Sequence, residues 1–239
     1  FYENSAANYG GAISYQQAGL GVYYSNAKQV RDYFLDKTYR TELGRQDFYE
    51  EFIGPGELED RIKAAGISST YNTYAPMRDT HFIFRDFGTD ITPTEMGYSN
   101  AQTATNVQIP TFKHTQSSLK YNESTGTYDF YLYGQLQQDG EDNEVVSFEN
   151  VILQCTDYYV YDEHGYLIYL YYNQTDTTGW YITNGEAIKI TWSKAVSNEK
   201  LDYEITKYYD ENGNEIEVNP GKTYIALVPA DGWSSVTLN

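Results

Sequence analysis

The stretch that decides the fold is WYITNGEAIKITW, residues 180–192. Its two arms are rich in β-branched and aromatic residues, which favour strands. Between the arms stands Asn184-Gly185, a pair that adopts the positive φ angles of a tight hairpin turn at little cost. Because side chains alternate along a strand, Ile190 and Trp192 share one face and Lys189 lies on the other. The stretch therefore predicts an antiparallel β-hairpin with one apolar face.

The same pattern continues through the C-terminal half. A second pair, Asn212-Gly213, joins residues 204–209 to residues 215–218, and a final run at 223–228 closes the sheet. Upstream, short aromatic and β-branched runs are mostly bounded by Gly, Asn or Asp, as strands are. These strands are expected at residues 118–121, 127–133, 145–156, 158–161 and 166–172. From about residue 106 onward, the sequence predicts a mainly antiparallel β domain.

The first hundred residues carry the helical signals. Ser25 can cap a helix that runs to about Tyr39. A second helix is expected from Pro55 to Gly66, with acidic residues near its positive end. Residues 80–85 then alternate like a half-buried strand. The signals of this half are those of an α/β or α+β domain.

Between the two halves, residues 92–110 are polar and bounded by proline, which is typical of a linker. We therefore expect two domains, an N-terminal α/β domain at residues 1–105 and a tyrosine-rich antiparallel β domain at residues 106–239. The expected fold class is α+β.

Charge and hydropathy limit the partners. Sixteen basic and 34 acidic residues give a net charge of -18, which repels phosphate backbones and argues against nucleic acid. The longest strongly apolar stretch, residues 166–172, is too short to cross a bilayer. Cys155 is the only cysteine, so an intramolecular disulfide and a cysteine-rich metal site are excluded.

Four motifs follow one another in the C-terminal half. They are WYITNG at 180–185, ITWSK at 190–194, YDENG at 209–213 and NPGKTY at 219–224. Their order resembles the C-terminal domain of YerB-type lipoproteins of Gram-positive bacteria, a family without an assigned function. With similar runs at 121–128 and 149–154, the resemblance covers about residues 111–229.

The resemblance implies an extracytoplasmic cell-envelope protein, held by a lipid anchor upstream of Phe1. It also singles out three positions. Arg31 keeps one arginine of the family's Arg-rich segment, His81 keeps the histidine of a His-Asn pair, and Asp139 keeps the carboxylate of a His-x-Asp motif. If the lost groups serve a ligand or metal in the family, this chain is expected not to bind it.

Tyrosine is the most unusual feature of the composition, with 27 residues. Tyrosines on both faces of a sheet can be explained by cross-strand pairing. They can also form an exposed aromatic surface for a glycan, a peptide or a protein. On the second interpretation, Tyr131 and Tyr133 join Arg31, His81 and Asp139 as candidate ligand-binding residues.

Catalytic and metal-binding patterns are weak. None of the three histidines, His81, His114 and His164, lies in a motif that supports a catalytic base. The acidic loops at 139–144 and 210–215 offer oxygen ligands for calcium, but neither is an EF-hand loop, and hairpin chemistry explains the second. No catalytic residue, metal site or cofactor is predicted.

Three classes of function remain open from the residues. The leading hypothesis is a non-enzymatic extracytoplasmic module that binds or scaffolds a cell-wall component or an envelope protein. The alternative is an enzyme that acts on cell-wall glycan or peptide through acidic residues. A calcium-stabilised adhesive module is a third possibility.

Overall fold

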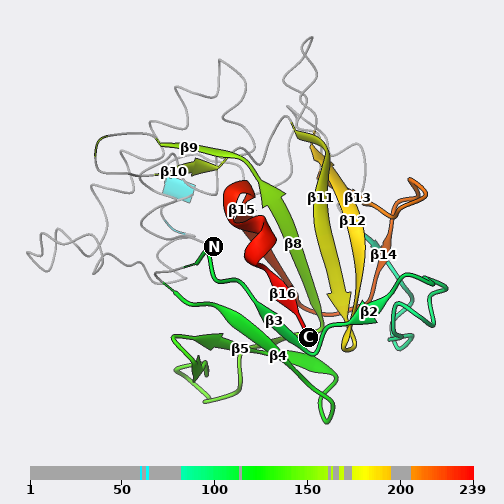
Figure 1. Cartoon of the computed structure of the whole chain (residues 1–239). Coiled ribbons are helices and arrows are strands. Elements are labelled where there is room, and N and C mark those ends of the chain that lie inside the picture. Colours follow the sequence, from blue (N-terminus) through cyan, green and yellow to red (C-terminus); the bar gives the residue numbers. More distant parts are fainter. Residues whose placement is uncertain are drawn as a thin grey trace, which may run out of the picture. The chain divides into compact units, whose positions relative to one another are not determined.

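The computed structural model describes residues 60, 63–64, 82–112, 115–160, 163, 167–169, 174–194 and 206–239 (Figure 1). The chain divides into two compact units. One comprises Phe1–Asp79 with Val196–Tyr203, and the other comprises Thr80–Ala195 with Glu204–Asn239. Nearly all described residues belong to the second unit, so the fold described below is the fold of that unit.

A six-stranded large sheet runs in the order β13-β12-β11-β8-β15, and β2 also pairs with β12. Its strands are β2 (Gln102–Thr103), β8 (Asn150–Thr156), β11 (Gln174–Thr183), β12 (Glu186–Lys194), β13 (Lys207–Tyr209) and β15 (Thr223–Pro229). The predicted hairpin is confirmed, because Thr183 pairs with Glu186 and both Asn184 and Gly185 have positive φ. The edge strand β15 lies parallel to β8, whereas the other pairs in this sheet are antiparallel.

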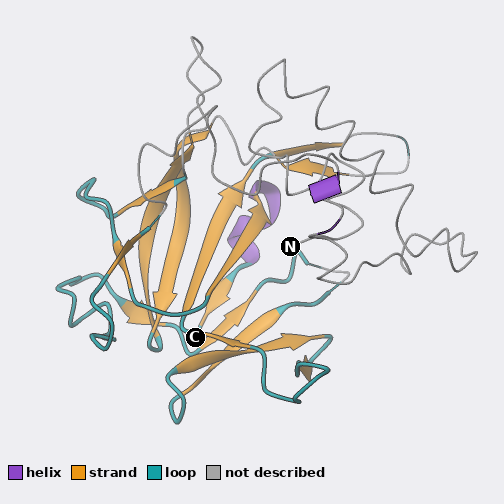
Figure 2. Ribbon diagram, turned by 180° about the vertical axis from the view of Figure 1, so that it is seen from behind, coloured by secondary structure: helices purple, strands orange, loops and turns teal. Residues whose placement is uncertain are grey.

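A six-stranded small sheet runs in the order β16-β3-β4-β5-β6, with β7 pairing with β5 (Figure 2). Its strands are β3 (Asn106–Gln108), β4 (Ser118–Asn122), β5 (Thr127–Leu132), β6 (Gln135–Leu136), β7 (Ser147–Phe148) and β16 (Thr237–Leu238). All its pairs are antiparallel. The last residues of the chain thus pair with a strand more than a hundred residues upstream.

The main core lies between facing strands of the two sheets. Val107, Leu119 and Tyr128 from the small sheet are fully buried in the same cluster as residues of the large sheet. The residues of the large sheet in this cluster are Val151, Leu153, Ile182, Ala187, Ala226 and Val228. Since neighbouring side chains on a strand point to opposite faces, residues 106, 108, 118, 120, 129 and 131 lie on the outer face of the small sheet.

The second face of the large sheet is buried as well. Ile152, Tyr181, Ile188 and Trp192 form a separate cluster there. Chain from residues 82–101 covers it with partly buried side chains, which are Phe82, Met96, Tyr98 and Ala101. Burial on both faces explains why all seven residues of β8 are buried.

Two short strands complete this cover. β1 (Ile83–Phe84) pairs in parallel with β14 (Glu217–Val218). The remaining elements are the ribbon of β9 (Tyr158–Val160) and β10 (Leu167–Tyr169), and the 3-10 helix η2 (Ala230–Ser235).

The prediction of an α+β fold with an N-terminal α/β domain is wrong. The described part of the chain is mostly β-sheet, and its helical residues are η2 and three positions, Asp60, Lys63 and Ala64. The prediction places residues 82–105 in the α/β domain, yet they supply β1 and β2 and cover the large sheet. The apolar side chains of this segment are irregularly spaced, and they pack against a sheet that is formed mainly by later residues. Because this packing is between distant parts of the chain, the spacing of residues within the segment does not predict it.

The predicted linker at 92–110 is likewise part of the folded unit, because Ala104, Val107 and Ile109 are buried there. The helix expected at 25–39 lies outside the described residues. The domain division at residues 105 and 106 stays a prediction, since it concerns residues 1–79 as well.

The second predicted hairpin is reduced to one isolated bridge, because β13 pairs with β12 and β14 pairs with β1. Its turn also differs from the prediction. Tyr209 bridges to Glu215, but only Gly213 of the Asn212-Gly213 pair has positive φ. Asp210 closes a longer loop instead. Its carboxylate Oδ1 accepts the backbone N–H groups of Asn212 at 2.8 Å and Asn214 at 2.9 Å.

Candidate functional site

Three of the five candidate ligand-binding residues lie in the described part of the chain. Tyr131 is on β5, Tyr133 follows it in the β5–β6 turn, and Asp139 begins the next loop. Arg31 and His81 lie outside the described residues, as do His114 and His164. The two tyrosines therefore belong to one arm of the small sheet, which we call the β5–β6 arm, residues 127–147.

Asp139 has a turn-forming role. Its carboxylate Oδ1 accepts the backbone N–H of Glu141 at 2.8 Å, and its own N–H donates to the carbonyl of Glu144 at 2.8 Å. Asn143 donates its backbone N–H to the carbonyl of Asp139 at 3.0 Å. Such a local bond from an Asp side chain to the backbone two residues on stabilises a turn. The acidic loop is thus explained by turn chemistry.

The outer face of the small sheet carries two rows of residues in register. The first row is Gln108, Ser118, Tyr131 and Leu136, and the second is Asn106, Lys120, Asp129 and Ser147. We call these eight residues the open face. Apart from the buried Ser118, they are half-buried or exposed. The face thus combines one aromatic ring with amide, ammonium and carboxylate groups.

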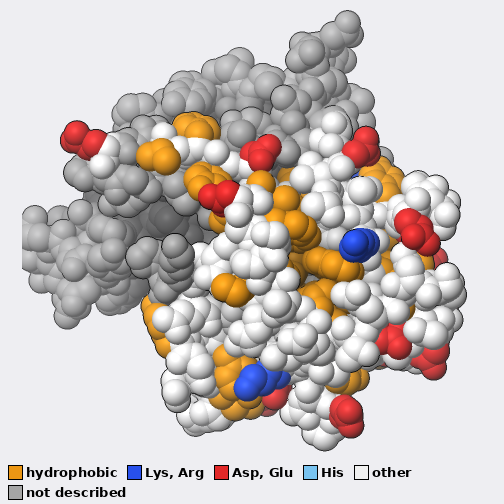
Figure 3. Space-filling view, viewed as in Figure 1, with side chains coloured by type: hydrophobic (Ala, Val, Ile, Leu, Met, Phe, Trp, Pro, Cys, Tyr) orange, Lys and Arg blue, Asp and Glu red, His pale blue; other side chains and the backbone are white. Residues whose placement is uncertain are grey.

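Tyr131 and Lys120 form the centre of the open face. The Lys120 Nζ lies 4.7 Å from the centroid of the Tyr131 ring, within the range of a cation–π contact. In Figure 3, Lys and Arg side chains are few, and one lies against hydrophobic side chains at the bottom of the view, where Figure 1 places β4 and β5. The contact thus holds the Lys120 ammonium group against the Tyr131 ring on the open face.

Tyr133 stands at the end of the β5–β6 arm in an unusual conformation. Its φ is 52°, and with Gly134 at 73° it closes the hairpin in which Leu132 pairs with Gln135. A left-handed conformation costs a bulky residue about 1–2 kcal/mol. The residue is nevertheless 61% exposed, so core packing does not require tyrosine there.

Sequence reasoning missed Lys120, Asp129 and Leu136 as members of this surface. The alternation of Leu119, Lys120 and Tyr121 already indicated which side chains of β4 face outward. What the sequence did not contain was the cross-strand register that sets Lys120 beside Asp129.

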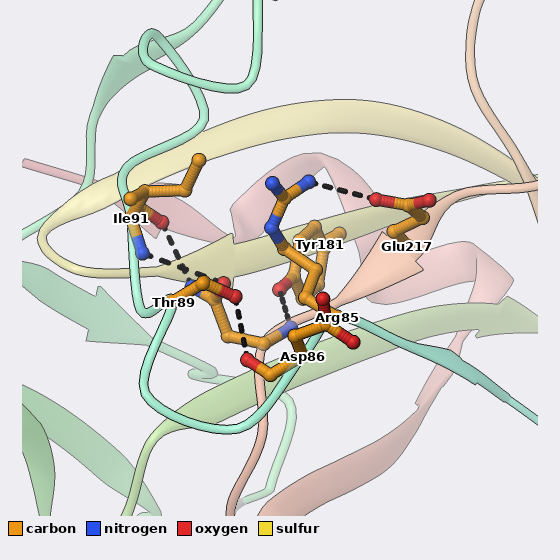
Figure 4. Close-up of polar contacts among 7 residues, drawn as sticks. Arg85, Asp86, Thr89, Ile91, Tyr181 and Glu217 are labelled. Atoms are coloured by element: carbon orange, nitrogen blue, oxygen red, sulfur yellow. Dashed lines mark hydrogen bonds and ion pairs between the residues drawn. The ribbon is translucent and has the colours of Figure 1, made fainter.

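A second polar group lies at one end of the large sheet and is fully buried. The Asn219 backbone N–H donates to the Tyr181 hydroxyl at 2.9 Å, and that hydroxyl donates to Oδ1 of Asn150 at 2.9 Å. The Asn219 Nδ2 donates to the carbonyl of Ile91 at 2.8 Å and to the Thr183 Oγ1 at 3.0 Å. Figure 4 shows Tyr181 and Ile91 in this arrangement, with the Arg85–Glu217 ion pair beside it.

Each group in this network has a partner within the chain. Asn150 Nδ2 donates to the Asn219 carbonyl at 2.8 Å, and Thr183 Oγ1 donates to the Glu149 carbonyl at 3.0 Å. Satisfied buried polar groups hold a structure in one arrangement. The network therefore fixes residue 91 and the turn that precedes β15 onto the large sheet, and we assign it a structural role.

Among the described residues, two carboxyl groups have a shifted pKa, and both accept hydrogen bonds within the chain. Partial burial of the Asp90 carboxyl, in a residue that is exposed as a whole, raises its pKa. A hydrogen bond from Asn184 acts in the opposite direction, and the charge of Glu149 adds to the rise. Glu149 accepts the backbone N–H of Lys222 at 2.6 Å. Burial acts to raise the pKa of Asp210, but hydrogen bonds from Asn214 and Asn212 outweigh it and leave the pKa below its usual value.

Burial also changes the pKa of several tyrosine hydroxyls and of the cysteine thiol. Burial raises the pKa of Tyr128, Tyr181 and Tyr208 far above the usual phenol value. Burial also raises the pKa of the Cys155 thiol, and Asp157 adds to this effect. These groups stay protonated near neutral pH, and the hydroxyls of Tyr128 and Tyr181 donate hydrogen bonds to the Ala104 carbonyl and to Asn150 Oδ1.

Two further properties of the described residues bear on the class of protein. They contain no group of three or more His, Cys, Asp or Glu side chains placed to hold a metal ion. Within the same residues, no helix has the length and apolar character that a membrane crossing requires.

The fold and the open face define a β protein of two packed sheets that presents a mixed aromatic and polar sheet surface. Residues 107–225 match the family described as "Protein of unknown function (DUF3048) C-terminal domain". Residues 107–225 therefore form a domain of this YerB-like family, whose function is unknown.

A solved structure agrees with this assignment at the level of the fold. The crystal structure of YerB protein from Bacillus subtilis superposes with a TM-score of 0.56 at 14% sequence identity. The match covers 79% of this chain and 55% of the YerB chain, so this chain spans little more than half of that protein's length. No curated protein matches the chain.

Proposed function

We propose that this chain is a non-enzymatic binding module of the cell envelope, and that it holds a cell-wall component on the open face. The observation that carries the proposal is the register of the small sheet, which sets the Tyr131 ring beside Lys120 and Asp129 on a solvent-facing surface. Tyrosine supplies contact area at a low cost in conformational entropy. The surrounding amide, ammonium and carboxylate groups can bond to the hydroxyl and amide groups of a wall polymer.

The β5–β6 arm extends this surface. Leu136 is 40% exposed and Tyr133 is 61% exposed, and Leu136 pairs with Tyr131 across the strands. Exposed apolar groups that gather beside polar groups are typical of an interaction surface. The strained backbone of Tyr133 supports the same conclusion, because an unfavourable conformation is retained where a side chain is needed at that position.

The family resemblance supports the proposed location of the module. A YerB-type protein is expected outside the cytoplasm, tethered by a lipid anchor upstream of Phe1. The negative net charge of -18 is compatible with a role in holding neutral or cationic parts of the wall, because it repels anionic polymers.

Sedimentation with insoluble cell-wall polymer tests the proposal. The chain is mixed with purified peptidoglycan, and the bound fraction is measured for the unchanged chain and for a Tyr131→Ala, Lys120→Ala double variant. We expect the double variant to bind at least about tenfold more weakly, as loss of a central aromatic contact does at other interfaces. Tyr159→Ala is the matched control, since it removes another tyrosine, 48% exposed, from β9.

Three outcomes contradict the proposal. Binding that survives the double variant excludes the open face. Absence of binding to wall polymer, together with capture of an envelope protein by the same face, replaces the wall component with a protein ligand. Release of wall fragments that disappears in Asp90→Asn or Glu149→Gln makes the chain an enzyme acting through its acidic residues.

A further inference from the structure

A second exposed apolar group lies far from the open face in the sequence, on the segment that covers the large sheet. Ile83 is 39% exposed, Phe84 is 52% exposed and Phe87 is 96% exposed. Phe87 stands in a turn in which the Thr89 N–H donates to the carbonyl of Asp86 at 3.0 Å. We call these three residues, with the outer edge of β1, the β1 edge.

One residue of β1, Phe84, presents backbone hydrogen-bonding groups that no described strand pairs with. Phe84 pairs with Val218, and the Arg85 N–H donates to the Val218 carbonyl at 3.0 Å. Of two residues in register in a parallel pair, one bonds to the neighbours of the other, and here Val218 is the residue that bonds across, to the neighbours of Phe84. The N–H and C=O of Phe84 therefore point outward, and no strand in the described part of the chain pairs with that side of β1.

The edge is held firmly in place. The Phe82 ring stacks on the Tyr208 ring, with centroids 5.8 Å apart and planes 3° from parallel. The Phe84 ring contacts the Phe82 ring in a tilted arrangement, with centroids 5.7 Å apart. On the other side, the Arg85 Nη1 bonds to the Glu217 carboxylate at 2.7 Å, as Figure 4 shows. A fixed strand loses little conformational entropy on binding, which favours the addition of another strand.

The charge around the β1 edge is acidic. Arg85 is the only Lys or Arg between residues 82 and 112, and its charge is already matched by Glu217. Asp86 and Asp90 are both exposed on either side of Phe87. In a symmetric pair of two copies, these carboxylates would meet the same carboxylates of the partner, which disfavours self-association.

We propose that the β1 edge docks an extended peptide segment of a partner protein, in which basic side chains alternate with apolar ones. The segment adds a strand to β1 through the outward N–H and C=O of Phe84. Its apolar side chains cover Phe84 and Phe87, and its basic side chains meet Asp86 and Asp90. This docking site is separate from the open face and does not depend on the wall-binding role.

Fluorescence anisotropy with labelled peptides of about ten residues tests the proposal. One peptide alternates Lys with Val, a second alternates Glu with Val, and a third repeats the Lys sequence with every second backbone nitrogen methylated on the strand-pairing side. We expect the Lys peptide to bind at least about tenfold more tightly than the other two. Its affinity should also fall as salt is raised.

Variants locate the site and separate it from the open face. Phe87→Ser is expected to weaken the Lys peptide about tenfold or more without affecting folding, because the side chain is almost fully exposed. Phe84→Ser should do the same, with its thermal melt recorded to confirm the fold. Leu136→Ser, which alters the β5–β6 arm, should leave peptide binding unchanged.

Several results would overturn the inference. Equal binding of the Lys and Glu peptides removes the charge argument, and equal binding of the methylated peptide removes strand addition. A Lys peptide that fails to bind, or that binds Phe87→Ser as well as the unchanged chain, removes the site. A concentration-dependent dimer that Phe87→Ser abolishes assigns the edge to a second copy instead.

Discussion

The backbone N–H of Asn219 is bonded to the hydroxyl of Tyr181 at 2.9 Å, although the two residues are 38 positions apart and both are fully buried. The same hydroxyl donates to Asn150 at 2.9 Å. One phenol thus satisfies a donor from the turn before β15 and an acceptor at the start of β8. Since buried donors without partners are costly, the arrangement should contribute measurably to stability.

Tyr181→Phe tests this contribution. The substitution leaves the Asn219 N–H and the Asn150 Oδ1 without the hydroxyl, and we expect a loss of about 1–3 kcal/mol in the free energy of unfolding. Chemical denaturation followed by tryptophan fluorescence measures it. Tyr159→Phe removes a hydroxyl from a tyrosine that is 48% exposed and should change stability by less than about 0.5 kcal/mol. Equal effects of the two variants would refute the role assigned to Tyr181.

Gly179→Ala should destabilise the large sheet by about 1–3 kcal/mol through overpacking. A Cβ at this position would lie 2.7 Å from the Leu153 carbonyl oxygen and 3.1 Å from Cγ1 of Ile190. The first contact is with backbone of the neighbouring strand, which cannot move aside. Gly140→Ala is the control, because no atom lies within 4 Å of its added Cβ. A neutral Gly179→Ala would show that β8 and β11 can separate without cost.

Asp210 should make stability depend on acid pH. Hydrogen bonds from Asn214 and Asn212 lower the pKa of Asp210 below its ordinary value of 3.8, against the effect of burial. A carboxyl whose pKa is lower in the folded state stabilises the fold above the unfolded-state pKa. That stabilisation is lost as pH falls from about 3.8 through the lower folded-state value.

The measurement is the midpoint of urea unfolding at a series of pH values between neutral and strongly acid. In Asp210→Asn the part of the acid loss that comes from Asp210 should be absent, so the two curves converge at low pH. Asp142→Asn, in an exposed loop, provides a control of equal charge change. Parallel curves for Asp210→Asn and the unchanged chain would contradict the prediction.

Tyr133→Asn should separate stability from binding. Asn tolerates positive φ better than Tyr, so relief of the strain at φ 52° should raise the free energy of unfolding by up to about 1 kcal/mol. Binding to wall polymer should weaken at the same time, because the exposed ring is lost. Tyr159→Asn, at a position without positive φ, should give no gain in stability. A variant that gains stability and keeps full wall binding would remove Tyr133 from the binding surface.

Local patterns were enough for part of the fold. Asn184-Gly185 gave both the place and the geometry of the β11–β12 turn, because positive φ at two successive residues is a local property. Runs of aromatic and β-branched residues bounded by turn residues placed β4, β5 and β15 close to their true limits. The run at 145–156, expected as one strand, forms the two strands β7 and β8. The turn of Tyr133 and Gly134 was missed, since tyrosine carries no turn signal and its φ is imposed by the pairing of Leu132 with Gln135.

Long-range pairing could not be predicted in the same way. Nothing local showed that Ile83 and Phe84 pair with residues 217 and 218, or that residues 92–110 are part of the folded unit. The expectation of an α/β N-terminal domain failed for this reason in the residues that are described. The irregular apolar side chains of Phe82, Met96 and Tyr98 bury against a sheet that forms only when distant strands assemble.

The candidate surfaces show the same division. The sequence showed that the chain is acidic, rich in tyrosine and built from antiparallel hairpins, because charge, composition and turn preference depend on each residue and its neighbours. Tertiary structure decided which tyrosines are buried, such as Tyr128 and Tyr181, and which are presented, such as Tyr133. It also set Tyr131 beside Lys120 and left the outer edge of β1 unpaired by the described strands, because register and edge position exist only between strands.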